Sequence, residues 1–172
     1  PSVGARDPRT RIRRCGARGI IKGEPEETGV ALATGAAPES VPGCVLRDGA
    51  TLHDTGTAAP VDLSRLPNPD YSLLDLDPYR YELLGDRFAF FEGTRGCPFP
   101  CTFCSRLLQG RTMRRKHPEQ LINEVERAVR RDGVRSAYFI DLEFHLGGAT
   151  NRALCDYLAE AQLPLKWCCQ LR

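Results

Sequence analysis

Residues 88–104 read FAFFEGTRGCPFPCTFC, and this stretch decides the fold of the second half of the chain. Its apolar start, 88–91, is typical of a short buried strand. A loop follows at once in which Cys97, Cys101 and Cys104 have the spacing C-x3-C-x2-C. Loops after the carboxyl ends of parallel strands are where α/β folds place their chemistry. The stretch therefore predicts a strand that ends in a functional, cysteine-rich loop.

The residues after this loop alternate between helix and strand patterns. Apolar residues at helical spacing predict a helix that opens near Pro118, and residues 134–141 form a strand pattern. Thr150 is a candidate cap for a second helix, Pro164 ends it, and residues 165–170 form a third strand pattern. The order β-α-β-α-β predicts an α/β fold with a parallel sheet.

The N-terminal half has weaker patterns. Residues 19–22 predict a buried strand, and Pro25 begins a helical segment that reaches about Thr34. Residues 43–53 predict a hairpin with Asp48-Gly49 at the turn. The Pro-, Asp- and Ser-rich residues that follow indicate a connector. We therefore divide the chain into residues 1–53, a connector at 54–86, and residues 87–172.

Composition excludes several classes of protein. Lys and Arg number 24 against 22 Asp and Glu, so the net charge of +2 gives no bulk attraction for nucleic acid. The sequence has no run of about 18 apolar residues that would cross a membrane and no secretory signal, so we expect a cytoplasmic protein. The eight cysteines are then expected to be reduced thiols. The basic run 9–14 is expected to be a frayed, solvated end.

The spacing of the three loop cysteines suits an inorganic centre. A structural zinc site needs four ligands, commonly two C-x2-C pairs, and the sequence offers no second pair. Adjacent Cys168 and Cys169 point to opposite faces of a strand and do not replace it. A 4Fe–4S cluster takes one cysteine per iron, so three cysteines would leave one iron open to an outside ligand. A zinc or Fe–S module without catalysis stays an alternative.

The loop FFEGTRGCPFPCTFC resembles the signature loop of radical S-adenosylmethionine (SAM) enzymes. The resemblance implies that Cys97, Cys101 and Cys104 hold a 4Fe–4S cluster whose fourth iron is chelated by SAM. It also implies that the reduced cluster cleaves SAM to a 5′-deoxyadenosyl radical that abstracts hydrogen from substrate. The residues it places near SAM are Phe103 beside the adenine, Asp141 and Glu143 at a strand end, and Arg172.

Further upstream, GIIKGEPEET (19–28), VPGCVLRDG (41–49) and LSRLPNPDYSLLDLDPYRY (63–81) resemble the stretch that joins a cobalamin-binding domain to the radical SAM barrel. The resemblance implies a partial (βα)6 barrel, with its first three strands and two helices, preceded by the tail of an α/β cobalamin-binding domain. We expect a fragment whose third strand leaves an open edge, and therefore poor expression or aggregation.

The function implied is cobalamin-dependent methyl transfer to a small-molecule or natural-product substrate, with cobalamin bound mainly by upstream residues. An electron donor such as flavodoxin or ferredoxin is the implied partner, and no nucleic acid is expected. A methylthiotransferase-like radical SAM enzyme is the alternative within the same chemistry. It would need a second cluster domain, which Cys15 and Cys44 alone do not supply.

Overall fold

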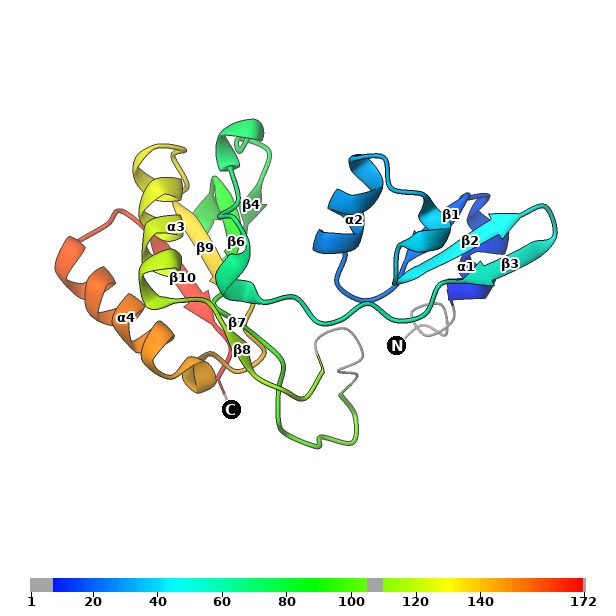
Figure 1. The fold of residues 1–172 in the computed structure, drawn as a ribbon. Coiled ribbons are helices and arrows are strands. Elements are labelled where there is room, and N and C mark those ends of the chain that lie inside the picture. The colour runs from blue at the N-terminus through cyan, green and yellow to red at the C-terminus, as the bar shows by residue number, and fades with distance from the viewer. Residues whose placement is uncertain (1–7, 105–109, 172) are drawn as a thin grey trace. The chain divides into compact units, whose positions relative to one another are not determined.

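The computed structural model describes residues 8–104 and 110–171, and the chain forms two compact units (Figure 1). The first unit comprises residues 1–61 and 100–109, and the second comprises residues 62–99 and 110–172. Residues 54–86 are thus shared: the segment as far as Val61 belongs to the first unit, and the segment from Asp62 belongs to the second.

The first unit is built on an antiparallel sheet of three strands in the order β1-β2-β3. The strands are β1 (Gly19–Ile21), β2 (Cys44–Asp48) and β3 (Thr51–Asp54). The predicted hairpin is present, but Asp48 pairs with Thr51, so the turn residues are Gly49 and Ala50. Gly49 has a φ of 55°, a conformation that favours glycine. The predicted first helix is α2 (Glu26–Ala33), and a short 3-10 turn, η2 (Pro38–Ser40), follows it.

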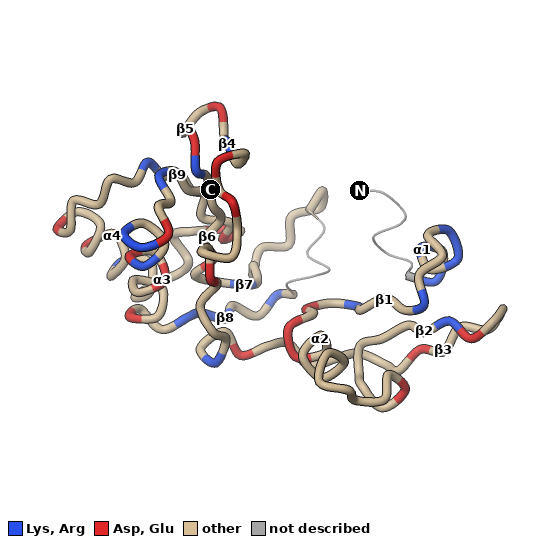
Figure 2. Tube along the Cα trace, turned by 90° about the horizontal axis from the view of Figure 1, so that it is seen from above, with Lys and Arg blue, Asp and Glu red and all other residues tan. Residues whose placement is uncertain are grey.

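The basic run near the N-terminus is solvated as expected, since its arginines are exposed, but it forms a helix and is not frayed. Helix α1 spans Pro8–Cys15, and its Lys and Arg positions are marked blue in Figure 2. Ile12 lies in the middle of the arginines and is completely buried. Burying one isoleucine contributes about 1.5–3 kcal/mol, which favours the packing of this helix.

The second unit contains a parallel sheet in the order β10-β9-β6, and the predicted β-α-β-α-β order is confirmed. The strands are β6 (Phe88–Phe91), β9 (Ser136–Phe139) and β10 (Lys166–Cys169). Helix α3 (Pro118–Arg130) connects β6 to β9, and α4 (Ala149–Ala161) connects β9 to β10. The register aligns Phe91 with Phe139 and Phe139 with Cys169, so the carboxyl ends of the strands lie together.

Shorter elements complete this unit. They are η3 (Leu63–Arg65), η4 (Tyr71–Leu73), β4 (Arg80–Tyr81), β5 (Gly85–Asp86), β7 (Thr94–Arg95), β8 (Arg114–Arg115) and η5 (Phe144–Gly147). Strands β4 and β5 pair antiparallel with each other, and so do β7 and β8. The pair β7 and β8 matters for function because it brackets the cysteine loop.

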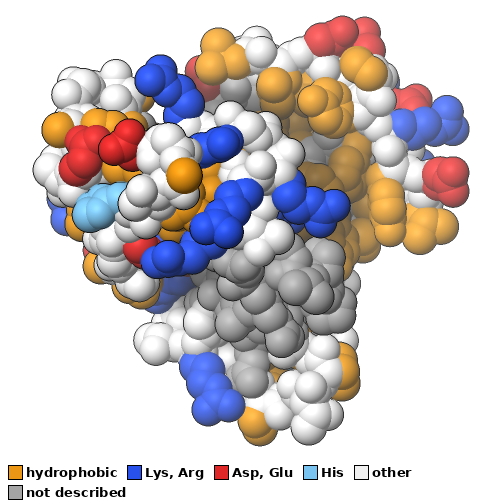
Figure 3. All heavy atoms as spheres, turned by 90° about the vertical axis from the view of Figure 1, so that its right-hand side faces the viewer, with side chains coloured by type: hydrophobic (Ala, Val, Ile, Leu, Met, Phe, Trp, Pro, Cys, Tyr) orange, Lys and Arg blue, Asp and Glu red, His pale blue; other side chains and the backbone are white. Residues whose placement is uncertain are grey.

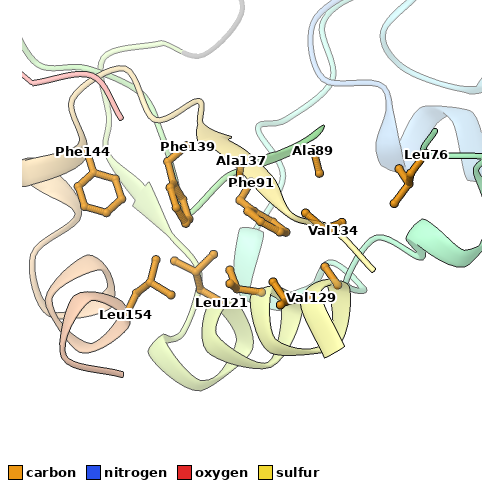
Figure 4. Packing of buried hydrophobic residues seen from close by; sticks show 12 residues of the cluster. Leu76, Ala89, Phe91, Leu121, Val129, Val134, Ala137, Phe139, Phe144 and Leu154 are labelled. Carbon is orange, nitrogen blue, oxygen red and sulfur yellow. The ribbon is translucent and has the colours of Figure 1, made fainter. Parts of the chain in front are cut away.

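The core of the second unit lies between the sheet and its helices (Figure 4). Leu121 and Val125 on α3 are fully buried, as the helical spacing predicts. Phe139 of β9 stands edge-on to Trp167 of β10, with 5.4 Å between the ring centres. Aromatic pairs of this geometry add about 0.5–1.5 kcal/mol beyond the area they bury, so they strengthen the sheet.

Two local predictions were wrong in this unit. Thr150 does not cap α4, since the helix begins at Ala149 after Gly148, whose φ is 60°. The Thr150 hydroxyl instead donates to the carbonyl of Lys116 at 2.8 Å, so a tertiary contact takes the side chain away from capping. Strand β9 ends at Phe139, which places Asp141 and Glu143 beyond the strand, where alternation no longer sets their direction.

Within residues 8–104 and 110–171, none of the helices combines the length and apolar character needed to cross a bilayer.

Candidate functional site

The cysteine loop leaves the sheet through a narrow, hydrogen-bonded base. Strands β7 and β8 pair at its two ends, and the amide of Cys97 donates to the carbonyl of Gly110 at 3.3 Å. Gly96 has a φ of 97°, and a Cβ there would lie 2.2 Å from the carbonyl oxygen of Thr112. Only glycine permits such an approach of two backbones, so Gly96 is required for the base to close.

The three loop cysteines differ in exposure. Cys97 is buried, Cys101 is half-buried and Cys104 is exposed, and each is a reduced thiol outside any disulfide. The amide of Cys104 donates to the carbonyl of Cys101 at 3.3 Å, which closes a turn between them. Cysteine thiolates are ligands that suit Fe–S clusters and zinc. The three loop cysteines therefore have the right chemistry for the expected iron–sulfur cluster.

Convergence of the thiols on one point is a separate question. Among the described residues, no group of three or more His, Cys, Asp or Glu side chains stands close enough together to hold a metal ion. Cys97 belongs to the second unit, whereas Cys101 and Cys104 belong to the first. The assignment of the three cysteines as cluster ligands therefore stays a prediction.

Phe103 and Arg172 are two residues expected near SAM, and only Phe103 is among the residues that the structure describes. The side chain of Phe103 is 88% exposed, so its ring is free to take a stacking partner. Arg172 lies outside the described residues. Their roles toward SAM stay predictions.

Asp141 is buried at the base of the cysteine loop. One carboxylate oxygen, Oδ2, accepts a hydrogen bond from the amide of Gly93 at 3.0 Å. The other, Oδ1, accepts from the hydroxyl of Thr94 at 2.7 Å and from the amide of Asn151 at 3.2 Å. The residue is only 1% exposed, so both oxygens of its carboxylate are covered by protein and bound to protein donors.

Glu143 lies in the turn after β9 and is placed differently. Its Oε2 is 3.6 Å from Nδ1 of His145, and its side chain is 13% exposed. His145 is more open, with 44% of its side chain exposed. His145 is therefore open to a partner at this strand end, whereas Glu143 is mostly covered and Asp141 is buried.

A buried ion pair stands next to the loop base. Lys116 directly follows β8, and its ammonium is 2.5 Å from Oε2 of Glu124 on α3. The two side chains are 5% and 2% exposed. Burial raises the pKa of Glu124 above its ordinary value, and Lys116 opposes that rise.

A second carboxylate pairs at the end of β6. The guanidinium Nε of Arg95 lies 2.9 Å from Oε2 of Glu92. Burial raises the pKa of Glu92, while Arg95 lowers it. The loop base thus contains two ion pairs, Lys116 with Glu124 and Arg95 with Glu92.

Sequence reasoning missed the residues that build this base. Lys116, Glu124 and Asn151 are buried polar residues outside any motif, and Thr94 is a buried polar residue of the quoted loop stretch without a predicted role. The one available signal was a polar residue within an apolar helical pattern: Glu124 lies directly before Val125 on the buried side of α3. Buried charges need partners, so such a position indicates an ion pair.

No protein-family model matches the chain. The sequence is similar to the anaerobic magnesium-protoporphyrin IX monomethyl ester cyclase of Cereibacter sphaeroides, with 29% identity over 157 residues, which cover 86% of this chain and 26% of the cyclase. It is also similar to the hopanoid C-2 methylase of Rhodopseudomonas palustris, with 38% identity over 104 residues, which cover 59% of this chain and 18% of the methylase. The chain spans about a quarter or less of the length of these curated relatives.

Solved structures share the fold. The apo form of OxsB, a cobalamin-dependent S-adenosylmethionine radical enzyme, matches with a TM-score of 0.70 and 21% identity, over 98% of this chain and 24% of that chain. The radical S-adenosylmethionine methyltransferase TsrM from Kitasatospora setae, solved with cobalamin and a [4Fe-4S] cluster, matches with a TM-score of 0.61 and 16% identity, over 94% of this chain and 34% of that chain. At these identities the likeness establishes the mixed α/β fold.

Proposed function

Because the chain is a relative of the cobalamin-dependent radical SAM enzymes, we propose that it supplies the segment that binds the iron–sulfur cluster and SAM. The reaction we propose is methyl transfer to a small-molecule substrate. The observation that carries the proposal is the C-x3-C-x2-C loop, which emerges from β6 at the carboxyl end of a parallel sheet. That is the edge at which α/β folds place their chemistry.

The roles of the residues follow from their chemistry. Cys97, Cys101 and Cys104 would bind three irons of a 4Fe–4S cluster as thiolates and leave the fourth iron for SAM. When bound, the cluster supplies the electron that cleaves SAM reductively. The exposed ring of Phe103 offers a stacking surface for the adenine. Glu143, which is 13% exposed near the same strand end, would offer a carboxylate to the SAM amino group, and Arg172 would offer a guanidinium to a carboxylate.

The domain assignments extend the proposal. Residues 87–172 would form the first part of a (βα)6 barrel, residues 1–53 the tail of a cobalamin-binding domain, and residues 54–86 the connector. Cobalamin would be held mainly by residues outside this chain, and flavodoxin or ferredoxin would donate the electron. Basic, acidic and hydrophobic side chains are all visible in the view of Figure 3. The net charge of +2 gives no bulk attraction for nucleic acid, which favours a small-molecule substrate.

Anaerobic reconstitution with iron and sulfide tests the proposal. We expect about four irons per chain in the wild type, a brown colour, and a change in the cluster's electron paramagnetic resonance spectrum when SAM is added. Cys97→Ser, Cys101→Ser and Cys104→Ser should each lose most of the bound iron. Cys15→Ser is the matched control, since Cys15 is a free, exposed thiol on α1, and it should load iron as the wild type does.

Several outcomes would contradict the proposal. One is stoichiometric zinc binding without iron uptake, which would indicate a structural module. Another is a disulfide among the loop cysteines in an oxygen-free preparation. A third is a loaded cluster whose spectrum does not respond to SAM, which would indicate electron transfer without SAM chemistry.

A further inference from the structure

The base of the cysteine loop is held by the second unit itself, through a carboxylate at its centre. Asp141 accepts hydrogen bonds from Gly93 and Thr94, which precede Cys97 by four and three residues. Each oxygen of the carboxylate has a donor at 3.0 Å or less. Hydrogen bonds to an ionised, buried carboxylate are among the stronger ones, so this residue ties the first strand of the loop base to the end of β9.

Helix α4 adds a third contact to the same group. The side-chain amide of Asn151 donates to Asp141 at 3.2 Å and to the carbonyl of Phe144 at 2.7 Å. Asn151 is packed tightly against the loop base, because a Cβ added to Gly93 would lie 2.6 Å from its Oδ1. Gly93 is therefore enclosed by Asp141 and Asn151 together.

The returning strand of the loop base is fixed from the same side. The amide of Lys116 donates to the carbonyl of Gly93 at 2.9 Å, and the Thr150 hydroxyl donates to the carbonyl of Lys116 at 2.8 Å. Both ends of residues 96–113 are thus attached to the sheet and to α4 before any metal is bound. Asp141 is the side chain that contacts the outgoing strand directly.

From these contacts we propose that Asp141 is a positioning residue that clamps the base of the cysteine loop, and that it is not a ligand of SAM. The proposal depends on the proposed function in one respect only, namely that the loop binds an iron–sulfur cluster. A ligand role would require a free oxygen that faces solvent, whereas the Asp141 carboxylate is buried and accepts three hydrogen bonds from protein groups. Glu143, whose side chain is 13% exposed, is less enclosed than Asp141.

Thiol alkylation of the metal-free chain tests the clamp without a cluster or SAM. Iodoacetamide is added in the presence of a chelator, and the rate at each cysteine is read by peptide mass spectrometry. We expect Asp141→Asn to alkylate buried Cys97 about tenfold faster, which corresponds to about 1.4 kcal/mol for opening of the base. The asparagine keeps only one acceptor oxygen, so at least one of the two amide donors, Gly93 or Asn151, would face its NH2 group and lose its acceptor.

The chain provides its own controls. Buried Cys44 in the first unit and half-buried Cys155 on α4 should keep their wild-type rates in Asp141→Asn. Glu143→Gln removes the same charge from the same strand end and should leave Cys97 unchanged. Thr94→Val keeps the carboxylate and removes one donor, so it should raise the Cys97 rate by a smaller factor.

The outcomes separate the clamp from its alternatives. A wild-type Cys97 rate in Asp141→Asn overturns the proposal, and overturns it in favour of a ligand role if SAM affinity of the loaded enzyme falls at the same time. If Cys155 also becomes fast, the unit has unfolded, and Thr94→Val then decides: a faster Cys97 alone supports the clamp, and an unchanged Cys97 rejects it. If the wild type binds no iron, the proposed function fails while the alkylation result still stands.

Discussion

Replacing Lys116 by methionine would leave a carboxylate buried without its partner. Lys116 and Glu124 are nearly inaccessible to water, and their charged groups are in direct contact. Breaking a buried pair from one side costs about 3–5 kcal/mol, because the remaining charge stays desolvated. We therefore expect Lys116→Met to lower the free energy of unfolding of the second unit by that amount at pH 7.

The loss should depend on pH in a direction set by Glu124. Burial already raises the pKa of Glu124 above its ordinary value of 4.5, and Lys116 opposes that rise. Without Lys116 the folded-state pKa rises further, so the folded variant takes up a proton that the unfolded chain does not bind. Stability from a raised carboxyl pKa is present at low pH and is lost as pH rises through the folded value. The variant should therefore recover by up to about 1.4 kcal/mol per pH unit on acidification below that value.

Urea unfolding followed by fluorescence measures this effect in the right part of the molecule. Trp167 is the single tryptophan of the chain, and it packs on Phe139 and Phe144 in the second unit. The double variant Lys116→Met with Glu124→Leu removes both charges, and we expect it to approach or exceed the stability of the wild type.

Three results would refute this reasoning about the pair. The first is a loss below about 1 kcal/mol in Lys116→Met at pH 7, where an unpaired buried charge should cost about 3–5 kcal/mol. The second is a loss that stays the same between pH 7 and pH 5.5. The third is a double variant no more stable than the single one, which would mean that the unpaired charge was not the cause.

Two further predictions concern packing and acid stability. Gly93→Ala should destabilise the second unit by about 1–3 kcal/mol in urea unfolding, because its methyl group would lie 2.6 Å from Oδ1 of Asn151. Gly29→Ala, in open space on α2, should instead stabilise the chain by about 0.5–1 kcal/mol, and the opposite order would contradict the packing. Hydrogen bonds from Ser72 hold the pKa of Asp70 at about 2, so its contribution is present above its ordinary 3.8 and is lost as pH falls toward 2. Asp70→Asn should therefore flatten the fall in melting temperature between pH 4 and pH 2.5, and an unchanged slope would show that Asp70 does not contribute.

The regular elements of the second unit were predictable because their side chains repeat with the period of their backbone. Leu121 and Val125 lie one turn apart and both are buried, so the sequence alone places α3 against the sheet. The order of strands and helices then predicts a parallel sheet, because the connections are long enough to cross over. These are local signals that need no knowledge of distant residues.

The parts that escaped prediction depend on contacts between residues far apart in sequence. Ile12 is one apolar residue among arginines, and only its burial against the sheet explains α1. Thr150 has the identity of a cap, yet a carbonyl 34 positions away takes its hydroxyl. The burial of Asp141 also escaped prediction, because the sequence does not reveal that Gly93 and Thr94 lie beside it as donors.

The closed base of the cysteine segment bears on how proteins of this kind diversify. Because Thr94 pairs with Arg115 and Arg95 with Arg114, both ends of residues 96–113 leave the sheet side by side. Doubling the length of a flexible segment with joined ends costs only about 0.6 kcal/mol in chain entropy. Insertions that keep the spacing of the three cysteines would therefore be thermodynamically cheap, and the helices and strands beneath them could stay the same.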